Sequence, residues 1–135
     1  MNALRFPVAA TLLAWLLLVP TTGLRAADAG KPVGTVVVPA GLKLAEVREV
    51  VVVSLVQRNW TVKEKTDDRA VGYLNHRGIE ATLTLTFDTH QVSLFCEGWK
   101  VDKAGKRLKP EMPDGWIANM KKDVTKRLNL AAAKK

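Results

Sequence analysis

The sequence predicts an α+β domain in the order β-α-β-β-β-β-α, with two helices packed on one face of an antiparallel meander sheet. Four consecutive short segments after residue 59 alternate between apolar and polar residues and are separated by turn signals, which is typical of neighbouring antiparallel strands. Two other segments each carry one apolar stripe at helical spacing. Because two such helices cover only one face of a sheet, the opposite face is expected to be open to solvent.

The first strand is expected at residues 34–38, where a β-branched run ends at Pro39. A helix of about four turns is predicted from Leu42 onward. Its apolar residues recur at i, i+3, i+7 and i+11, and they are Leu44, Val47, Val51 and Leu55. The valines at 50–53 favour a strand by local propensity, but a strand would bury Glu46 or Glu49 beside them, so a helix is predicted.

Four strands are predicted next, at residues 60–65, 70–77, 79–88 and 91–97. In the first, Trp60, Val62 and Glu64 are expected on one side. The third has the clearest alternation, with Ile79, Ala81, Leu83, Leu85 and Phe87 facing one way and Glu80, Thr82, Thr84, Thr86 and Asp88 facing the other. In the last strand, Val92, Leu94 and Cys96 continue the apolar face, whereas Phe95 shares the polar one.

Residues 99–113 are rich in Lys and Pro and are expected to form a long connection over the surface. Asp114 is placed to cap a second helix. The apolar stripe of this helix again follows helical spacing and consists of Ile117, Met120, Val124 and Leu128. Trp60 and Trp116 stand where each helix meets the sheet, so we expect them to anchor the core or its edge.

The N-terminus has the three parts of a secretory signal peptide. A positive region ends at Arg5, an apolar run covers residues 6–19, and Pro20 precedes a region in which cleavage after Ala26 is favoured. The apolar run has about 14 residues, whereas a membrane-spanning helix needs about 20. We therefore expect a cleaved signal and an exported protein, periplasmic or secreted. The alternative is a surface protein that an uncleaved leader tethers to the membrane.

The chain divides into a signal peptide (1–26), a disordered leader (27–32), a single α+β domain (33–130) and a tail (131–135). Cleavage would leave 109 of the 135 residues, enough for one domain with one core. The single cysteine, Cys96, lies far from the leader, so it offers no site for N-terminal lipidation, and alone it forms no internal disulfide.

The mature chain is basic. Without Arg5 and Arg25 the 21 basic residues become 19, against 13 acidic residues, a net charge of +6. This balance favours anionic partners such as lipid headgroups or an acidic glycan, and an envelope protein is a further candidate partner. Export makes nucleic acid the least expected partner. A basic surface that only aids solubility is the alternative.

Several segments between residues 58 and 128 resemble a group of small, uncharacterised bacterial envelope proteins, many of them lipoproteins. These segments are Arg58-Asn59-Trp60-Thr61-Val62, Gly72-Tyr73-Leu74-Asn75-His76-Arg77, Ile79-Glu80-Ala81, Phe87-Asp88 and Trp116-Ile117-Ala118-Asn119-Met120. The chain departs from that pattern in lacking a lipidation cysteine and in having Cys96-Glu97-Gly98-Trp99 where a more polar strand end is expected. The resemblance implies an α+β envelope domain and transfers no activity and no site residue.

No set of side chains predicts a catalytic, cofactor or metal site. Cys96 shares the face of Val92 and Leu94, so we expect a buried, unreactive thiol. His76 and His90 lack a third ligand and are expected in turns or on the surface. The acidic residues offer no convincing pair for acid–base catalysis. A small hydrolase or metal-binding protein whose site the sequence does not display stays open as another class.

We interpret the protein as a non-enzymatic binding or adaptor module of the cell envelope, which uses the open sheet face and the basic connection. The candidate contact residues are Thr82, Thr84, Thr86, Phe95 and Trp99 on the face and Lys103, Lys106 and Arg107 on the connection. Two alternatives stay open: the connection folds back over the aromatic rings, or its cations only solvate a mobile loop. The same face would also suit a homodimer that buries Phe95.

Overall fold

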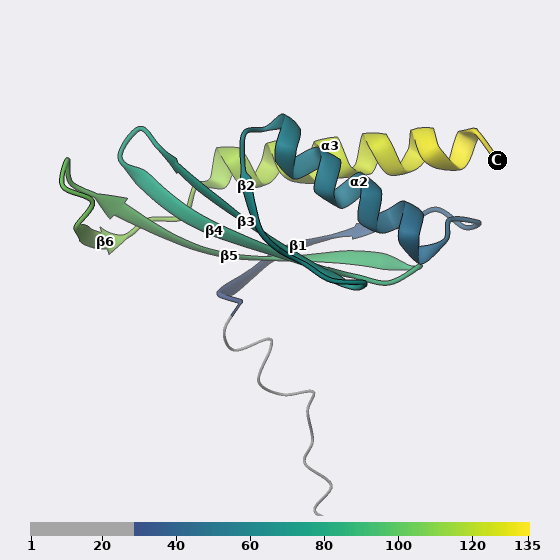
Figure 1. Cartoon of the computed structure of the whole chain (residues 1–135), viewed down its shortest axis with the longest axis horizontal. Helices are drawn as coiled ribbons and strands as arrows, with labels where there is room; N and C mark the ends of the chain where they lie inside the picture. The colour runs from purple at the N-terminus through teal and green to yellow at the C-terminus, as the bar shows by residue number, and fades with distance from the viewer. Residues whose placement is uncertain (1–28) are drawn as a thin grey trace, which may run out of the picture.

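The computed structural model describes residues 29–135, which form one antiparallel sheet and two helices (Figure 1). The strands are β1 (Lys31–Val37), β2 (Thr61–Lys65), β3 (Arg69–His76), β4 (Ile79–Phe87), β5 (Gln91–Val101) and β6 (Arg107–Pro110). The helices are α2 (Leu44–Gln57) and α3 (Asp114–Ala133). Both helices lie on the same face of the sheet (Figure 1), so the predicted fold class is confirmed. The predicted signal peptide, residues 1–26, lies outside the described residues.

The sheet has the order β1-β5-β4-β3-β2, and β6 pairs with β5 beyond the end of β1. β2 to β5 therefore form the predicted meander, since each strand pairs with the next one along the chain. A two-residue loop joins β3 to β4, and both of its residues have positive φ, 51° at Arg77 and 77° at Gly78. This backbone conformation matches the right-handed twist of the strands that it joins.

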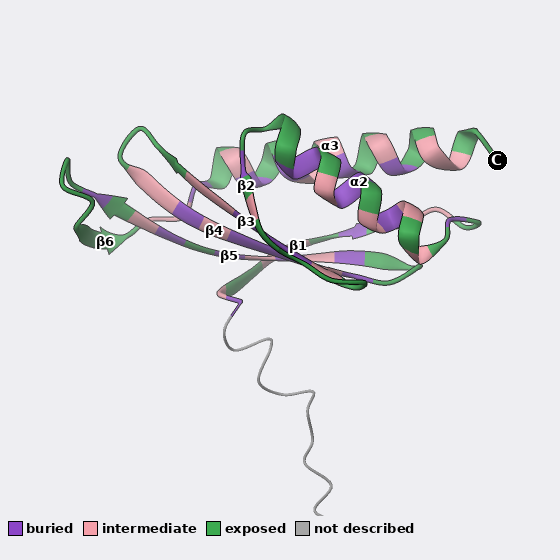
Figure 2. Cartoon of the chain, viewed as in Figure 1, coloured by how far each residue is buried: buried purple, intermediate pink, exposed green. Residues whose placement is uncertain are grey.

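The core lies between the sheet and the helices, where Figure 2 shows the buried residues gathered. Every residue of the two predicted helical stripes is buried except Leu44, which is half-buried. The sheet contributes the apolar residues of β4 and β5, among them Ala81, Leu83, Leu85, Phe87, Val92, Leu94 and Cys96. The predicted alternation of these two strands is therefore confirmed.

The long surface connection predicted at residues 99–113 is wrong in part, because seven of its fifteen residues, 99–101 and 107–110, lie in strands. β5 continues to Val101, because its pairing with β4 runs on to the pair Ile79–Lys100. A tight loop then reverses the chain: Oδ1 of Asp102 accepts hydrogen bonds from the backbone N–H groups of Ala104 and Lys106, each at 2.9 Å. The returning segment forms β6, a sixth strand absent from the predicted order.

Three predicted boundaries are also wrong. β1 begins at Lys31, inside the leader predicted to be disordered (27–32), because this segment pairs with β5. α3 continues to Ala133, inside the predicted tail (131–135), because Ala131 and Ala132 pack against the core. Asp114 is the first residue of α3 and not its cap. Pro113 holds the cap position, and its carbonyl accepts the backbone N–H groups of two residues in the first turn.

Glu64 does not share the side of Trp60 and Val62. A β-bulge between Val62 and Glu64 shifts the register, so that Val62 pairs with Gly72 and Glu64 with Val71. The extra residue places Glu64 on the open face of the sheet, where its side chain is exposed. A carboxylate that strict alternation would point at the core therefore stays in solvent.

Candidate functional site

The sheet face opposite the helices is uncovered by any helix (Figure 1). The predicted contact residues of β4 and β5 lie on it, because they alternate with the core residues of these strands. Thr82, Thr86 and Phe95 are half-buried there. Thr84 is 2% exposed, and strand register places it between Val71 and Phe95. Side chains opposite one another on adjacent strands lie about 5 Å apart, so these two apolar neighbours cover the threonine. This burial corrects the prediction for Thr84, which is not accessible to a partner.

Arg107 is held by its own chain. Its Nε and Nη2 donate hydrogen bonds to Oε1 of Glu80 at 3.0 and 2.8 Å, and its Nη1 lies 3.7 Å from Oε1 of Glu97. The guanidinium lies over the ring of Trp99 at 5.1 Å from the centroid, and Nε1 of Trp99 donates to Glu97 at 2.8 Å. Two carboxylates and an aromatic face thus engage Arg107. It fastens β6 to β4 and β5, although its side chain is still 51% exposed, and its role as a contact for a partner stays a prediction.

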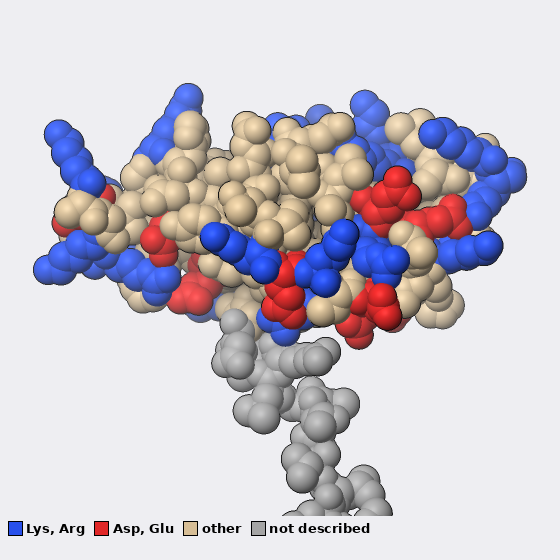
Figure 3. Space-filling model, in the orientation of Figure 1, with Lys and Arg blue, Asp and Glu red and all other residues tan. Residues whose placement is uncertain are grey.

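Lys103 and Lys106, in contrast, are exposed at the tip of the β5–β6 hairpin. The backbone N–H of Val101 donates to the carbonyl of Gly78 at 2.8 Å, so the hairpin lies against the β3–β4 turn. Exposed cations from the β3–β4 turn and from the β5–β6 hairpin lie at this end of the sheet, which we call the basic end: Arg77, Lys100, Lys103, Lys106 and Lys109. Figure 3 shows Lys and Arg side chains projecting from this end of the molecule.

The cations of the basic end form no ion pair with the described part of the chain. Among residues 29–135, the ion pairs involve Arg48, Arg58, Arg69, Arg107 and Lys135, and none of the five residues of the basic end. The one carboxylate in the hairpin loop, Asp102, accepts backbone hydrogen bonds. The basic end therefore concentrates positive charge that an anionic partner can use.

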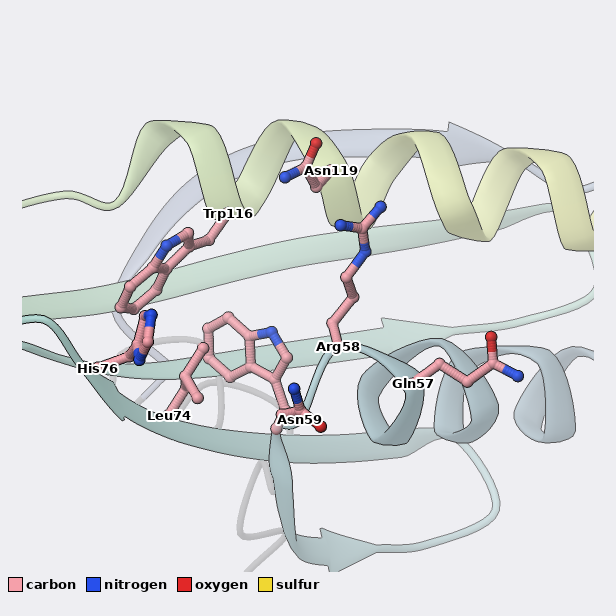
Figure 4. A pocket seen from close by; sticks show the side chains of 8 residues that line it. Gln57, Arg58, Asn59, Leu74, His76, Trp116 and Asn119 are labelled. Atoms are coloured by element: carbon pink, nitrogen blue, oxygen red, sulfur yellow. The ribbon is translucent and has the colours of Figure 1, made fainter.

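A pocket that the sequence pattern does not predict lies where the end of α2, β3 and the first turns of α3 meet (Figure 4). Its volume is about 340 Å³. The lining residues are Gln57, Arg58, Asn59, Trp60, Leu74, His76, Trp116 and Asn119. These residues come from three separate segments of the chain, and no pattern in the sequence indicates that they meet in a pocket.

Two tryptophans form the inner wall of this pocket. The rings of Trp60 and Trp116 meet edge to face, with centroids 6.0 Å apart, and the imidazole of His76 lies 6.3 Å from the Trp116 ring. Trp60 is 4% exposed, whereas Trp116 is half-buried. Trp60 is therefore a core anchor and Trp116 stands at the edge of the core, as predicted for both.

Local backbone structure fixes the start of the pocket wall. After α2, the backbone N–H of Asn59 donates to the carbonyl of Val56 and that of Trp60 donates to the carbonyl of Leu55, both at 3.0 Å. These two bonds define a Schellman motif, which requires a left-handed residue at Asn59, and its φ is 63°. Asn tolerates this conformation better than most residues. The chain therefore turns sharply from helix to strand and directs Trp60 into the core.

Arg58 joins α2 to α3. Its Nε donates to Oδ2 of Asp123 at 2.6 Å and its Nη2 to Oδ1 of Asp123 at 3.3 Å. The hydrogen bond from Arg58 lowers the pKa of Asp123 below its ordinary value, with smaller coulombic contributions from Arg58, Arg127 and Lys122. The carboxylate is therefore ionised at neutral pH, and it neutralises the one arginine that lines the pocket.

Cys96 is a core residue, as predicted. Its side chain is fully buried, and burial raises the pKa of its thiol to about 12. His76 and His90 are exposed and stand at opposite ends of β4, next to its two turns. In the part of the chain that the structure describes, no group of three His, Cys, Asp or Glu side chains could hold a metal ion.

No protein-family model matches the sequence, and no curated protein is significantly similar to it. Neither helix between residues 29 and 135 is long and apolar enough to cross a membrane. The structure itself defines the class of the protein as an α+β domain with an antiparallel meander and helices on one face.

Proposed function

We propose that this chain is an exported, non-enzymatic binding module of the cell envelope, which contacts anionic lipid headgroups through its basic end. The observation that carries the proposal is the gathering of five exposed cations, outside every ion pair of the described residues, on the β3–β4 turn and the adjoining β5–β6 hairpin. Export itself rests on the N-terminal pattern of a positive region, an apolar run and a cleavage region at Ala26.

Electrostatic attraction of the expected size would suffice for reversible binding. A basic side chain near an anionic membrane surface contributes about 1 kcal/mol at physiological ionic strength. Removing four lysines would then weaken binding by about 4 kcal/mol, or nearly three orders of magnitude. Since salt screens such charges, the affinity should also fall steeply as the salt concentration rises.

The test is co-sedimentation of the purified protein with vesicles of phosphatidylglycerol and phosphatidylcholine, compared with phosphatidylcholine alone. The variant replaces Lys100, Lys103, Lys106 and Lys109 with Gln. A matched control removes the same charge elsewhere, from the exposed residues Lys65, Lys122, Lys126 and Lys134. We expect the basic-end variant to lose binding to the anionic vesicles and the control to lose much less. Equal losses would show that net charge alone drives binding and would overturn the proposed role of the basic end.

Intact mass spectrometry of the exported protein tests the localisation. A mass that corresponds to residues 27–135 is expected for a signal cleaved after Ala26. The mass of the whole chain in a membrane fraction would instead support the alternative of an uncleaved tether.

A further inference from the structure

We propose that the pocket between α2, β3 and α3 binds a neutral saccharide unit, with Trp116 against the sugar ring and the amides of Asn59 and Asn119 on its hydroxyl groups. The pocket has a volume of about 340 Å³, within the range of small-molecule sites. The proposal does not rest on the basic end, whose ligand is anionic.

The apolar wall of the pocket suits the C–H face of a sugar ring. Trp116 is half-buried, so part of its indole faces solvent, and its edge-to-face contact with the buried Trp60 holds the ring in place. Leu74 adds an aliphatic surface beside it (Figure 4). Indole rings present a rigid apolar surface with a polar N–H at one edge, which matches a ligand that has both apolar faces and polar edges.

The polar rim has unused hydrogen-bonding capacity. Within residues 29–135, only two of the lining side chains make hydrogen bonds: Arg58 donates to Asp123, and the amide oxygen of Gln57 accepts from Arg127. The exposed side chains of Asn59, His76 and Asn119 stay free for a ligand. A planar amide offers a donor and an acceptor side by side, and two neighbouring hydroxyl groups can satisfy both at once.

The charge of the pocket selects against an acidic ligand. Asp123 forms two hydrogen bonds with Arg58, so the guanidinium at the pocket wall is already paired. The remaining lining residues are amides, aromatic rings, one leucine and a histidine. A ligand carboxylate or phosphate would therefore find no free arginine or lysine in the lining, whereas neutral hydroxyl groups would find matching partners.

The wall is rigid before any ligand binds. The Schellman motif fixes Asn59 relative to Trp60, and the pair of Arg58 with Asp123 fastens the end of α2 to α3. Asn119 lies on α3 itself, one turn after Trp116. Because the backbone of these residues is already fixed, binding has to order only the side chains, which lowers the entropy cost of binding a small ligand.

The experiment titrates the purified protein with chitotetraose, cellotetraose and maltotetraose, and with tetragalacturonate as an acidic probe, using calorimetry and two-dimensional amide NMR. We expect at least one neutral probe to bind with a dissociation constant below about 1 mM and to shift amide signals around residues 57–60, 74–76 and 116–119. Trp116→Ala should weaken this binding at least tenfold. Asn119→Ala should weaken it at least threefold, whereas Asn129→Ala, a matched change at an exposed position of the same helix, should leave it unchanged.

Three results would overturn the assignment. The first is no binding of any neutral probe at millimolar concentration. The second is binding that Asn119→Ala and Asn129→Ala leave equally intact, a comparison that stays valid if Trp116→Ala fails to fold. The third is tighter binding of tetragalacturonate than of the neutral probes, because an acidic ligand contradicts the charge of the pocket. None of these results bears on the vesicle experiment, which involves other residues.

Discussion

Gly98 on β5 has no room for a side chain, and a single methyl group there should cost a large share of the stability. A Cβ at this position would lie 2.1 Å from the carbonyl oxygen of Glu111 and 2.9 Å from Cδ of Pro113. To restore an ordinary contact of 3.4 Å, the Glu111 carbonyl would have to move by about 1.3 Å. The Glu111 N–H, which donates to the carbonyl of Gly98 at 3.0 Å, belongs to the same segment and would be pulled away.

The cost of Gly98→Ala follows from these two effects. Overpacking costs about 1–3 kcal/mol and a lost hydrogen bond about 0.5–1.5 kcal/mol, so we expect a loss of about 2–4 kcal/mol. A domain of this size has a total stability of about 5–15 kcal/mol. The matched control is Gly115→Ala in the first turn of α3, where nothing lies within 4 Å of the added methyl. This change should stabilise the protein by up to about 1 kcal/mol, because alanine favours a helix.

Urea unfolding monitored by tryptophan fluorescence measures both variants. With a slope of about 2 kcal/mol/M, the midpoint of Gly98→Ala should fall by about 1–2 M, and that of Gly115→Ala should rise slightly. A midpoint of Gly98→Ala within about 0.3 M of the unmodified protein would refute the close approach of residue 111 to β5.

Three further predictions concern the end of α2 and the core. Asn59→Ala should cost about 1 kcal/mol in urea unfolding and Asn59→Gly should not, because φ is positive there. In Arg58→Met, the pKa of Asp123 measured by NMR should rise towards 3.8. In the unmodified protein, the pair of Arg58 with Asp123 stabilises the fold fully above pH 3.8, and this contribution is lost as the pH falls through the lowered pKa of Asp123. The difference in unfolding free energy between the unmodified protein and Arg58→Met should therefore become smaller in acid. The Cys96 thiol is fully buried, which also raises its pKa to about 12, so it should react with dithionitrobenzoate far more slowly in the folded than in the unfolded chain; equal rates would contradict its burial.

Much of the fold could be predicted because burial imposes periodicity on the sequence. The stripes of α2 and α3 and the alternation of β4 and β5 record which side of each element meets the core. A strand that is not buried leaves no such periodicity in the sequence. β6 is exposed along its whole length, so no alternation of apolar and polar residues predicts it. The bulge at Glu64 escapes prediction for a related reason, because an inserted residue breaks the period of two that alternation requires.

The candidate site could be predicted only in part, since the sequence shows charges but not their partners. Lys103 and Lys106 stay exposed as expected, whereas Arg107 lies between Glu80 and Glu97, residues 27 and 10 positions earlier in the chain. The pocket is harder still to predict. Trp60, His76 and Trp116 are far apart in the sequence, and only the complete fold brings the ring of Trp116 to 6.0 Å from that of Trp60 and 6.3 Å from that of His76.

The contrast between Arg107 and the lysines of the basic end shows how a basic domain can use one cation to stabilise its fold and leave others for the proposed binding. A guanidinium offers a planar fork that suits two carboxylates and an aromatic face at once, and Arg107 uses all three. An ammonium is a strongly hydrated point charge that gains little from an exposed ion pair. Arginine is therefore suited to fasten the hairpin that presents Lys103 and Lys106, and the lysines stay available for a surface. Arg107→Lys should accordingly loosen the hairpin while the net charge stays constant, so that vesicle binding falls without any loss of positive charge. Unchanged binding would mean that the lysines act independently of the hairpin's shape.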